Sequence, residues 1–326
     1  MTISDPSYSV AMKNQSSDIE FQNGVIIGNN KNLFLCEGAH SVMAFLTQAK
    51  VPSERSFENF ISNLDSRANA ILNKKNTEFL HVIFPDKHSV CYDDFPLKNF
   101  STLTKYYLER AGEFNKHILY LQDALVSLVD RPFLLTDTHL TVHGSAISAI
   151  SIVERLIGEN QKSHYDELIK YITPVFNFCG DLGSKVSPQQ TETQMVSASP
   201  WINALHHNWY QGGGSNGQVL LCFNSSSMFD KRLLLFGDSF GQQVSYFLSY
   251  FFKEVVFLRT PHFHQDIFER NLPDYVITSN VERYFSHVNA DVDCPSFFSY
   301  PSLNTAEYTP LASFREALSK VLSYGL

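Results

Sequence analysis

A serine that follows an apolar run and two small residues is the strongest chemical signal in this sequence. Residues 233–241 read Leu-Leu-Leu-Phe-Gly-Asp-Ser-Phe-Gly, and the apolar run is typical of a strand that is buried on both faces. We predict that this strand turns sharply into a helix, which places Ser239 where free backbone N–H groups and the helix dipole favour an oxyanion. Ser239 would then be a nucleophile for acyl chemistry. The alternative is that Asp238 or Ser239 only caps the helix, since both residue types are favoured there.

A second element, Asp137-Thr138-His139, offers the groups that a serine nucleophile needs. His139 can take the proton of a serine hydroxyl, and Asp137, two residues earlier, can hold the imidazole ring. On a loop, both side chains can face one cleft. A D-x-H pattern alone also fits an ordinary polar loop. Together with the Gly-Asp-Ser turn, however, it predicts a catalytic group of Ser239, His139 and Asp137.

The histidines also raise one metal-binding alternative. His139 and His143 are four residues apart and could share a helix face as zinc ligands. No glutamate stands at the second position of an H-E-x-x-H pattern, and the sequence indicates no third ligand. We therefore expect neither a metal nor a cofactor. We expect the pair His206-His207 and the triplet His262-Phe263-His264 to be loop histidines without a chemical role.

Apolar periodicity predicts the elements that must position these residues. Strands and helices are expected to alternate, which is the rhythm of an α/β fold. The expected strands are 25–27 and 33–35, forming a hairpin, and 79–84, 118–121, 133–135, 219–223, 232–236, 255–258 and 275–277. The expected helices are 53–72, 103–113, 144–157, 240–252, 263–270 and 311–322.

Residues 181–217 break this rhythm. They are rich in Ser, Gln, Thr and Gly and contain both tryptophans, Trp201 and Trp209. They form either a long surface loop or an insertion that covers the substrate, because structureless loops of this length are uncommon unless they are functional. We expect a polar N-terminal segment, 1–22, followed by one catalytic domain, 23–326, that contains this insertion.

Composition limits the classes of function. With 44% hydrophobic and 18% charged residues in 326, the chain is typical of a folded globular protein. Its net charge of -8 provides no positive field for a nucleic acid, so nucleic acid is excluded as a partner. The five cysteines form no C-x-x-C pair and are expected to be reduced thiols. The first 20 residues lack the apolar stretch of a secretory signal, and no membrane span is found, which favours the cytoplasm.

The order of the motifs is similar to that of a known family. The Gly237-Asp238-Ser239 block resembles that of the SGNH-hydrolase superfamily, most of whose members carry the Asp and His after the serine. A D-x-H motif ahead of the serine, as here, resembles the alginate O-acetyltransferase (AlgJ/AlgX-type) branch. Further stretches similar to that branch are 28–35, 82–92, 272–277 and 282–284.

This resemblance implies a three-layer α/β/α fold with a mostly parallel central sheet and a loop/β insertion. It implies transfer of an acetyl group to a carbohydrate or polysaccharide hydroxyl, with Ser239 as the nucleophile, His139 as the general base and Asp137 as the residue that orients it. The acyl donor is not identified, and a membrane acyltransferase partner is one source that relatives suggest. Family members act in the periplasm, which is the alternative to the cytoplasm.

Five residues are candidates for substrate binding, and we expect them near the serine. They are Arg259, Arg283, Tyr284, Trp201 and Trp209. The two arginines could bind an acidic sugar, with structural ion pairs as the alternative, and the two tryptophans could cover the acceptor site and exclude water. The same triad would serve a carbohydrate esterase if water replaced the sugar. A non-catalytic glycan-binding or assembly subunit is the alternative from a different class.

Overall fold

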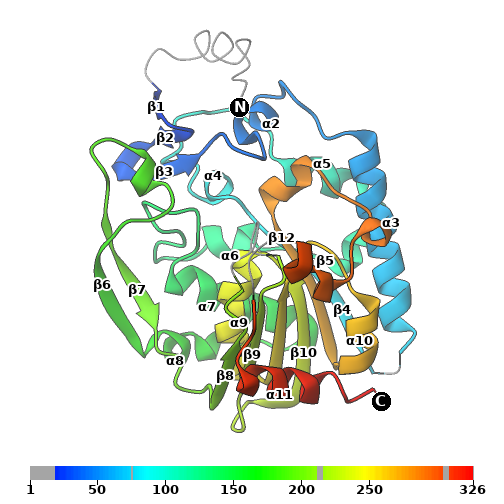
Figure 1. The fold of residues 1–326 in the computed structure, drawn as a ribbon. Coiled ribbons are helices and arrows are strands. Elements are labelled where there is room, and N and C mark those ends of the chain that lie inside the picture. Colours follow the sequence, from blue (N-terminus) through cyan, green and yellow to red (C-terminus); the bar gives the residue numbers. More distant parts are fainter. Residues whose placement is uncertain (1–18, 75, 211–215, 304–307, 326) are drawn as a thin grey trace.

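A seven-stranded sheet forms the centre of the computed structural model, which describes residues 19–74, 76–210, 216–303 and 308–325 (Figure 1). The strand order is β5-β4-β12-β10-β11-β9-β8, in which the first five strands are parallel and β9 is antiparallel to both of its neighbours. The strands are β4 (Glu78–Phe84), β5 (Ile118–Tyr120), β8 (Ala204–His207), β9 (Val219–Phe223), β10 (Phe229–Gly237), β11 (Phe252–Arg259) and β12 (Tyr275–Val281). The sheet is therefore mostly parallel, as expected.

Helices cover both faces of this sheet (Figure 1). Side chains alternate along β10, so Leu233 and Leu235 pack against one helical layer and Leu234 and Phe236 against the other. The first layer contains α6 (Gln122–Val126), α7 (Val142–Ile157), α8 (Tyr165–Ile169) and α9 (Ser239–Phe251). The second contains α3 (Glu54–Leu72), α5 (Leu103–Arg110), α10 (Gln265–Asn271) and α11 (Ala312–Val321). This confirms the three-layer α/β/α architecture.

Shorter elements connect these layers. The described residues contain two further short α-helices, α2 (Val42–Leu46) and α4 (Lys87–Val90). The 3-10 helices of the same described segments are η1 (Asn29–Lys31), η2 (Gly112–His117), η3 (Lys162–His164), η4 (Gly183–Lys185), η6 (Glu282–Ser286), η7 (Asp291–Asp293) and η8 (Phe297–Leu303). Among the described residues, no helix is both long and apolar enough to cross a membrane.

A small antiparallel sheet opens the described chain and lies at the top of Figure 1. It contains β1 (Glu20–Gln22), β2 (Val25–Ile27) and β3 (Leu33–Leu35), and the pairing of β2 with β3 is the hairpin expected from the sequence. The last residues of the expected polar segment 1–22 therefore belong to a strand. The Leu33 N–H donates to the Leu135 carbonyl at 2.9 Å, which joins the small sheet to the chain just before Asp137.

One expected strand is absent from the described residues. Residues 133–135 form no strand but a single bridge between Phe133 and Leu140, because the chain folds back and the Leu134 N–H donates to the His139 carbonyl at 3.1 Å. The run is apolar because Phe133 and Leu134 are buried in the core. For residues 181–217, of which 211–215 lie outside the described chain, the sequence leaves open a long surface loop or an insertion that covers the substrate. They contain β8 and β7 (Glu192–Ser197), which pairs with β6 (Ile172–Phe178) in a ribbon at the left of Figure 1.

Candidate active site

The turn between β10 and α9 presents Ser239 as the first residue of the helix. The side chain of the preceding residue, Asp238, accepts a hydrogen bond from the Phe240 N–H at 2.9 Å and thereby caps the helix. Its other oxygen accepts from the Val281 N–H at 2.6 Å. The turn is tight, and a side chain at Gly237 would collide with the Ser279 hydroxyl. The capping alternative is thus correct for Asp238, and the Ser239 hydroxyl is left for another partner.

That partner is His139. Its Nε2 lies 2.8 Å from Ser239 Oγ, and its Nδ1 lies 2.6 Å from Asp137 Oδ1. The same Asp137 oxygen accepts the His139 backbone N–H at 2.9 Å, and the second oxygen accepts the Asp181 N–H at 2.9 Å. With a proton on Nδ1 held by the carboxylate, Nε2 is the acceptor for the serine hydroxyl. The structure therefore brings together the three residues singled out in the sequence.

Electrostatics keep the Asp137 carboxylate charged. Burial raises its pKa, but the hydrogen bond and charge of His139, with the backbone N–H groups of Asp181 and His139, outweigh burial and lower the pKa to about 2. Because Asp137 is only 7% exposed, water competes little for these bonds. The His139 side chain is 33% exposed, so the Nε2 face of the pair remains accessible to a ligand.

Two acidic residues that the sequence did not single out brace the loop carrying Asp137 and His139. Asp181 accepts from the Thr138 N–H at 2.8 Å and the Thr138 hydroxyl at 2.7 Å. Glu192 accepts from the Thr136 N–H at 2.7 Å and the Thr136 hydroxyl at 2.9 Å. Both braces come from the segment expected to cover the substrate, so part of that segment supports the loop. No local motif marks either residue, because their partners lie far away in the sequence.

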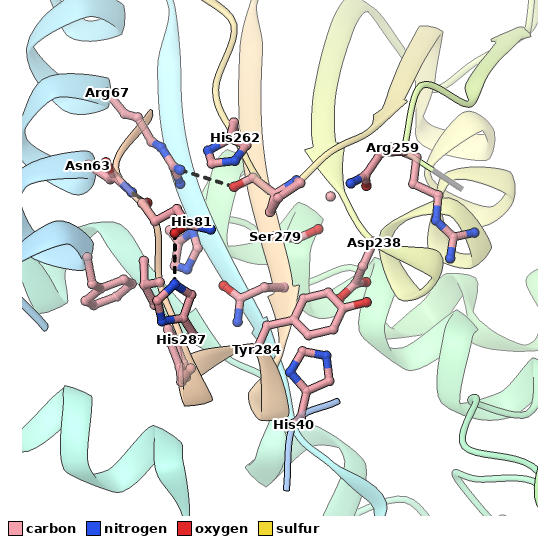
Figure 2. Close-up of a pocket in the computed structure, with 18 residues that line it drawn as sticks. His40, Asn63, Arg67, His81, Asp238, Arg259, His262, Ser279, Tyr284 and His287 are labelled. Carbon is pink, nitrogen blue, oxygen red and sulfur yellow. Dashed lines mark hydrogen bonds between the residues drawn. The ribbon is translucent and has the colours of Figure 1, made fainter. Parts of the chain in front are cut away.

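A cavity of about 300 Å³ lies beside the serine turn, at the carboxyl ends of β10, β11 and β12 (Figure 2). Gly237 and Asp238 of the turn line it, and Arg259, the last residue of β11, lines it on the neighbouring strand. Figure 2 shows the rings of Tyr284 and His40 next to each other, with their centroids 4.6 Å apart. The structure therefore brings two of the candidate substrate-binding residues, Arg259 and Tyr284, to one cavity.

Arg259 is a cation of this cavity without a carboxylate partner among the described residues. Burial lowers the pKa of His81 to about 3 and also lowers the pKa of His40, so both rings are neutral at pH 7. Arg67 pairs with Asp291 at 2.7 Å. Arg259 Nη1 lies 3.2 Å from Gln218 Oε1, and no carboxylate in the described part of the chain pairs with it. The guanidinium is therefore free to bind an anionic group of a ligand.

Arg283, by contrast, is committed to the protein. Its buried guanidinium forms an ion pair with Asp86 and lies over the Phe240 ring, 5.6 Å from the centroid. Phe240 in turn packs against the His139 ring, with centroids 5.2 Å apart. Arg283 therefore forms a structural ion pair, which was the alternative to substrate binding for this residue. Arg283 supports the packing of Phe240 against His139 and does not line the cavity.

The two tryptophans have different surroundings. The Trp201 indole N–H donates to the Tyr246 carbonyl at 3.0 Å, and its ring packs edge-on against Tyr250 on the later turns of α9. Because an indole N–H needs an acceptor when it leaves water, this residue anchors its segment to the helix and lies away from Ser239. Trp209 is 66% exposed, and its ring packs at a tilt against that of His207, with centroids 4.4 Å apart. Only Trp209 offers a free face.

The structure also shows the surroundings of His143 and His207, two of the clustered histidines. His143 Nδ1 lies 2.8 Å from the Tyr165 hydroxyl, and α7 begins at Val142, so His139 and His143 do not share a helix face. His207 is part of β8, not of a loop, and its Nε2 lies 3.1 Å from Gln242 Nε2 on the first turn of α9.

Two acidic clusters among the described residues could hold a cation. They are Asp137, His139 and Asp181, and Asp86, His88 and Glu282. In the first cluster, N–H and O–H donors of the protein already occupy all four carboxylate oxygens. Glu282 of the second cluster accepts from the Asp86 and Thr104 N–H groups at 3.1 Å each and from the Ser89 hydroxyl at 2.6 Å. These donors account for the carboxylates of Asp137, Asp181 and Glu282 without an ion.

No protein-family model and no curated protein matches this sequence. Solved structures do match its fold. A DHHW family protein from Eubacterium siraeum is 11% identical over 83% of this chain and 95% of its own, with a TM-score of 0.58. Bacillus cereus PatB1, solved with a sulfonyl adduct, is 12% identical over 85% of this chain and 97% of its own, with a TM-score of 0.57.

The O-acetyltransferase domain of Pseudomonas putida AlgJ is 15% identical over 87% of this chain and all of its own, with a TM-score of 0.51. At these identities the likeness concerns the fold. The resemblance drawn from the sequence is therefore confirmed at the level of the fold: the chain has a three-layer α/β/α fold similar to those of PatB1 and the AlgJ domain.

Proposed function

We propose that this protein transfers an acyl group, with acetyl as the favoured case, to a carbohydrate hydroxyl through a covalent intermediate on Ser239. The observation that carries the proposal is the chain of contacts from Ser239 Oγ to His139 Nε2 at 2.8 Å and from His139 Nδ1 to Asp137 at 2.6 Å. An AlgJ domain of similar fold is described as an O-acetyltransferase, which supports acetyl as the group.

The first half of the reaction acylates the serine. His139 Nε2 takes the proton of Ser239 Oγ as this oxygen attacks the carbonyl carbon of a donor ester, and the carbonyl becomes an oxyanion. The Ser239 N–H, at the amino end of α9, is one donor to that oxyanion. When the tetrahedral intermediate collapses, the bond to the donor oxygen breaks and that oxygen receives the proton from His139. Asp137 stabilises the imidazolium that exists between the two transfers.

The second half releases the acyl group to the acceptor. A sugar hydroxyl attacks the acyl-serine, His139 takes the hydroxyl proton, and a new ester bond forms as the bond to Ser239 Oγ breaks. The serine oxygen then recovers a proton from His139. If water attacks instead, the products are the free acid and serine, and the same site is an esterase. The donor is any ester that reaches Ser239, including one supplied by a membrane acyltransferase.

The acceptor would bind in the cavity beside the serine turn. Asparagine, histidine and tyrosine side chains line it and can pair with sugar hydroxyls, and Arg259 can pair with an acidic substituent. A volume of about 300 Å³ is at the lower end of the range for small-molecule sites. Trp209 offers an exposed ring for stacking, and it connects to α9 through His207 and Gln242.

A serine-directed probe tests the proposal. Because PatB1 was solved with a sulfonyl adduct, a sulfonyl fluoride is a suitable reagent, followed by intact-protein mass spectrometry and peptide mapping. We expect one adduct on Ser239 of the wild type and none on Ser239→Ala. Ser245→Ala, which changes a buried serine on the same helix, is the matched control and should react like the wild type. Equal labelling of wild type and Ser239→Ala, or labelling of neither, would contradict the proposal.

A chromogenic acetyl ester then separates transferase from esterase. We expect added glycan acceptor to gain acetyl groups and to increase the rate of ester consumption. If ester is consumed by the wild type but no acceptor gains acetyl, the enzyme is an esterase.

A further inference from the structure

Lys87 is a buried cation beside the proposed active site that the mechanism above does not use. It is the first residue of α4, three residues after β4, and it is only 4% exposed. Burial lowers the pKa of Lys87 to about 7, which reflects how unfavourable an ammonium group is away from water. A methionine of similar length would fill the same space without this penalty. The buried amino group is therefore best explained by what it binds.

Its Nζ donates to three backbone carbonyls from two separate segments. The acceptors are Leu33 of β3 at 2.8 Å, Leu135 at 2.9 Å and Asp137 at 3.3 Å. The three hydrogens of an ammonium group match three acceptors. One side chain thus joins the end of the central sheet, through α4, to the small N-terminal sheet and to the loop that carries Asp137.

We propose that Lys87 is a positioning residue that fixes the main chain at Leu135 and Asp137, so that the Asp137 carboxylate holds the His139 ring in line with Ser239. The inference rests on the proposed function. Asp181 and Glu192 bind N–H and hydroxyl groups of the same loop, whereas Lys87 binds its carbonyl groups. The N–H groups of the loop are therefore held by Asp181 and Glu192, and its carbonyl groups are held by the amino group of Lys87.

Removal of the ammonium leaves buried carbonyls short of a donor, and the loop relaxes to recover one. A displacement of about 1 Å at a general base is enough to slow a reaction about 100-fold. Because Lys87 touches no ligand in the proposed mechanism, the loss should fall on kcat and on the rate of serine labelling, with KM for the acetyl ester within about twofold of wild type.

The test uses the full chain with Lys87→Met and a matched control, Asn224→Ala. Asn224 is also buried and also binds backbone carbonyls, those of Ser249 at 2.8 Å and Tyr250 at 3.4 Å. It follows β9 at the amino end of β11, whereas Ser239 follows the carboxyl end of β10. Its loss lowers stability without touching the loop. Lys87→Gln is the second variant, because it keeps two N–H donors without the charge and still supports a measurement if the methionine variant does not fold.

Two quantities are measured for each variant: the rate of sulfonyl fluoride labelling and the rate of hydrogen exchange of the Thr136, Thr138 and His139 amides. The melting temperature of each variant is measured as well, so that a change in either rate can be separated from a loss of stability. We expect Lys87→Met to be labelled about 100-fold more slowly and Lys87→Gln about tenfold more slowly, with the control unchanged. The three amides should exchange on the order of tenfold faster in Lys87→Met, the equivalent of one lost hydrogen bond.

Labelling of Lys87→Gln within about twofold of wild type, or an equal slowing in Asn224→Ala at matched stability, overturns the inference. Failure of the proposed function looks different. In that case the wild type is not labelled at all, and the amide exchange, which requires no chemistry, still decides whether Lys87 holds the loop. Unchanged exchange in the Lys87 variants then overturns the inference, and faster exchange supports it.

Discussion

The charge of Asp137 can be removed with little change of shape by Asp137→Asn. The structure determines which way the amide should point. Asp137 Oδ1 accepts two N–H groups of His139, whereas Oδ2 accepts one, from Asp181. Because the amide oxygen does best where two donors meet it, we expect it to stay on His139 and the NH₂ group to face the Asp181 N–H. The histidine then keeps its proton on Nδ1 and loses only the negative charge beside it.

The magnitude follows from the pKa of the carboxyl group. A decrease from 3.8 to about 2 in the folded state corresponds to roughly 2 kcal/mol of interaction between the charged carboxylate and its surroundings. If that interaction supports the imidazolium in the transition state, its loss slows the reaction roughly 30-fold. If the amide turned the other way and forced the wrong tautomer, the loss would approach 10⁴-fold, as for such a substitution in a serine protease triad.

The assay is the pseudo-first-order rate of labelling by a sulfonyl fluoride, together with kcat/KM for a chromogenic acetyl ester. Asp181→Asn is the matched control, because it makes the same chemical change on the partner of the neighbouring Thr138 and does not touch the imidazole. We expect the control to lose less than about tenfold. Rates of Asp137→Asn within twofold of wild type, or an equal loss in both variants, would refute the assignment of Asp137 as the residue that supports His139.

Three further results are expected. Arg259→Met should raise KM for an acidic glycan acceptor about tenfold and leave serine labelling unchanged, because this guanidinium pairs with no carboxylate among the described residues. Acceptor kinetics measure this KM, and an unchanged value contradicts the role of Arg259 in binding the acceptor. Trp209→Ala should weaken glycan binding, measured by calorimetry, without a change in melting temperature. Trp201→Ala should lower the free energy of unfolding by roughly 2 kcal/mol and leave glycan binding unchanged. The reverse pattern would exchange the roles of the two tryptophans. Because the pKa of Asp137 is lower in the folded state, the stabilisation from its carboxylate is complete above about pH 4 and is lost as the pH falls towards 2. The unfolding free energies of wild type and Asp137→Asn, measured by urea titration, should therefore converge by roughly 2 kcal/mol over this range, and a constant difference would argue against the charge.

Features with a local signature were predictable from the sequence. The helix that begins at Glu54 is predicted by its apolar spacing and by the capping residue Ser53, whose hydroxyl accepts a hydrogen bond from the Ser56 N–H at 3.2 Å. The Gly-Asp-Ser turn is recognised because a buried strand, a capping residue and a helix follow each other directly. His139 could be chosen because Asp137 stands two residues away, within reach of its ring.

Features that depend on distant contacts were not predictable in this way. Residues 133–135 are apolar because the core surrounds them, and apolar character alone does not distinguish a buried loop from a buried strand. Asp181 meets Thr138 across 43 positions, and Lys87 meets Asp137 across 50, so no pattern of neighbours reveals either brace. Trp201 was expected near the substrate for its type, but its position depends on an acceptor on α9, 45 residues later.

The acyl-serine is the species on which the whole account depends, and it can be observed directly. The wild type is mixed with an activated acetyl ester, quenched in acid within the first turnovers and digested, and the peptides are examined by mass spectrometry. The account predicts one acetyl group on the peptide that contains Ser239, which disappears when a glycan acceptor is added before the quench and never forms in His139→Ala. Acetyl on another residue, or turnover of the ester without any acetyl on Ser239, would contradict it.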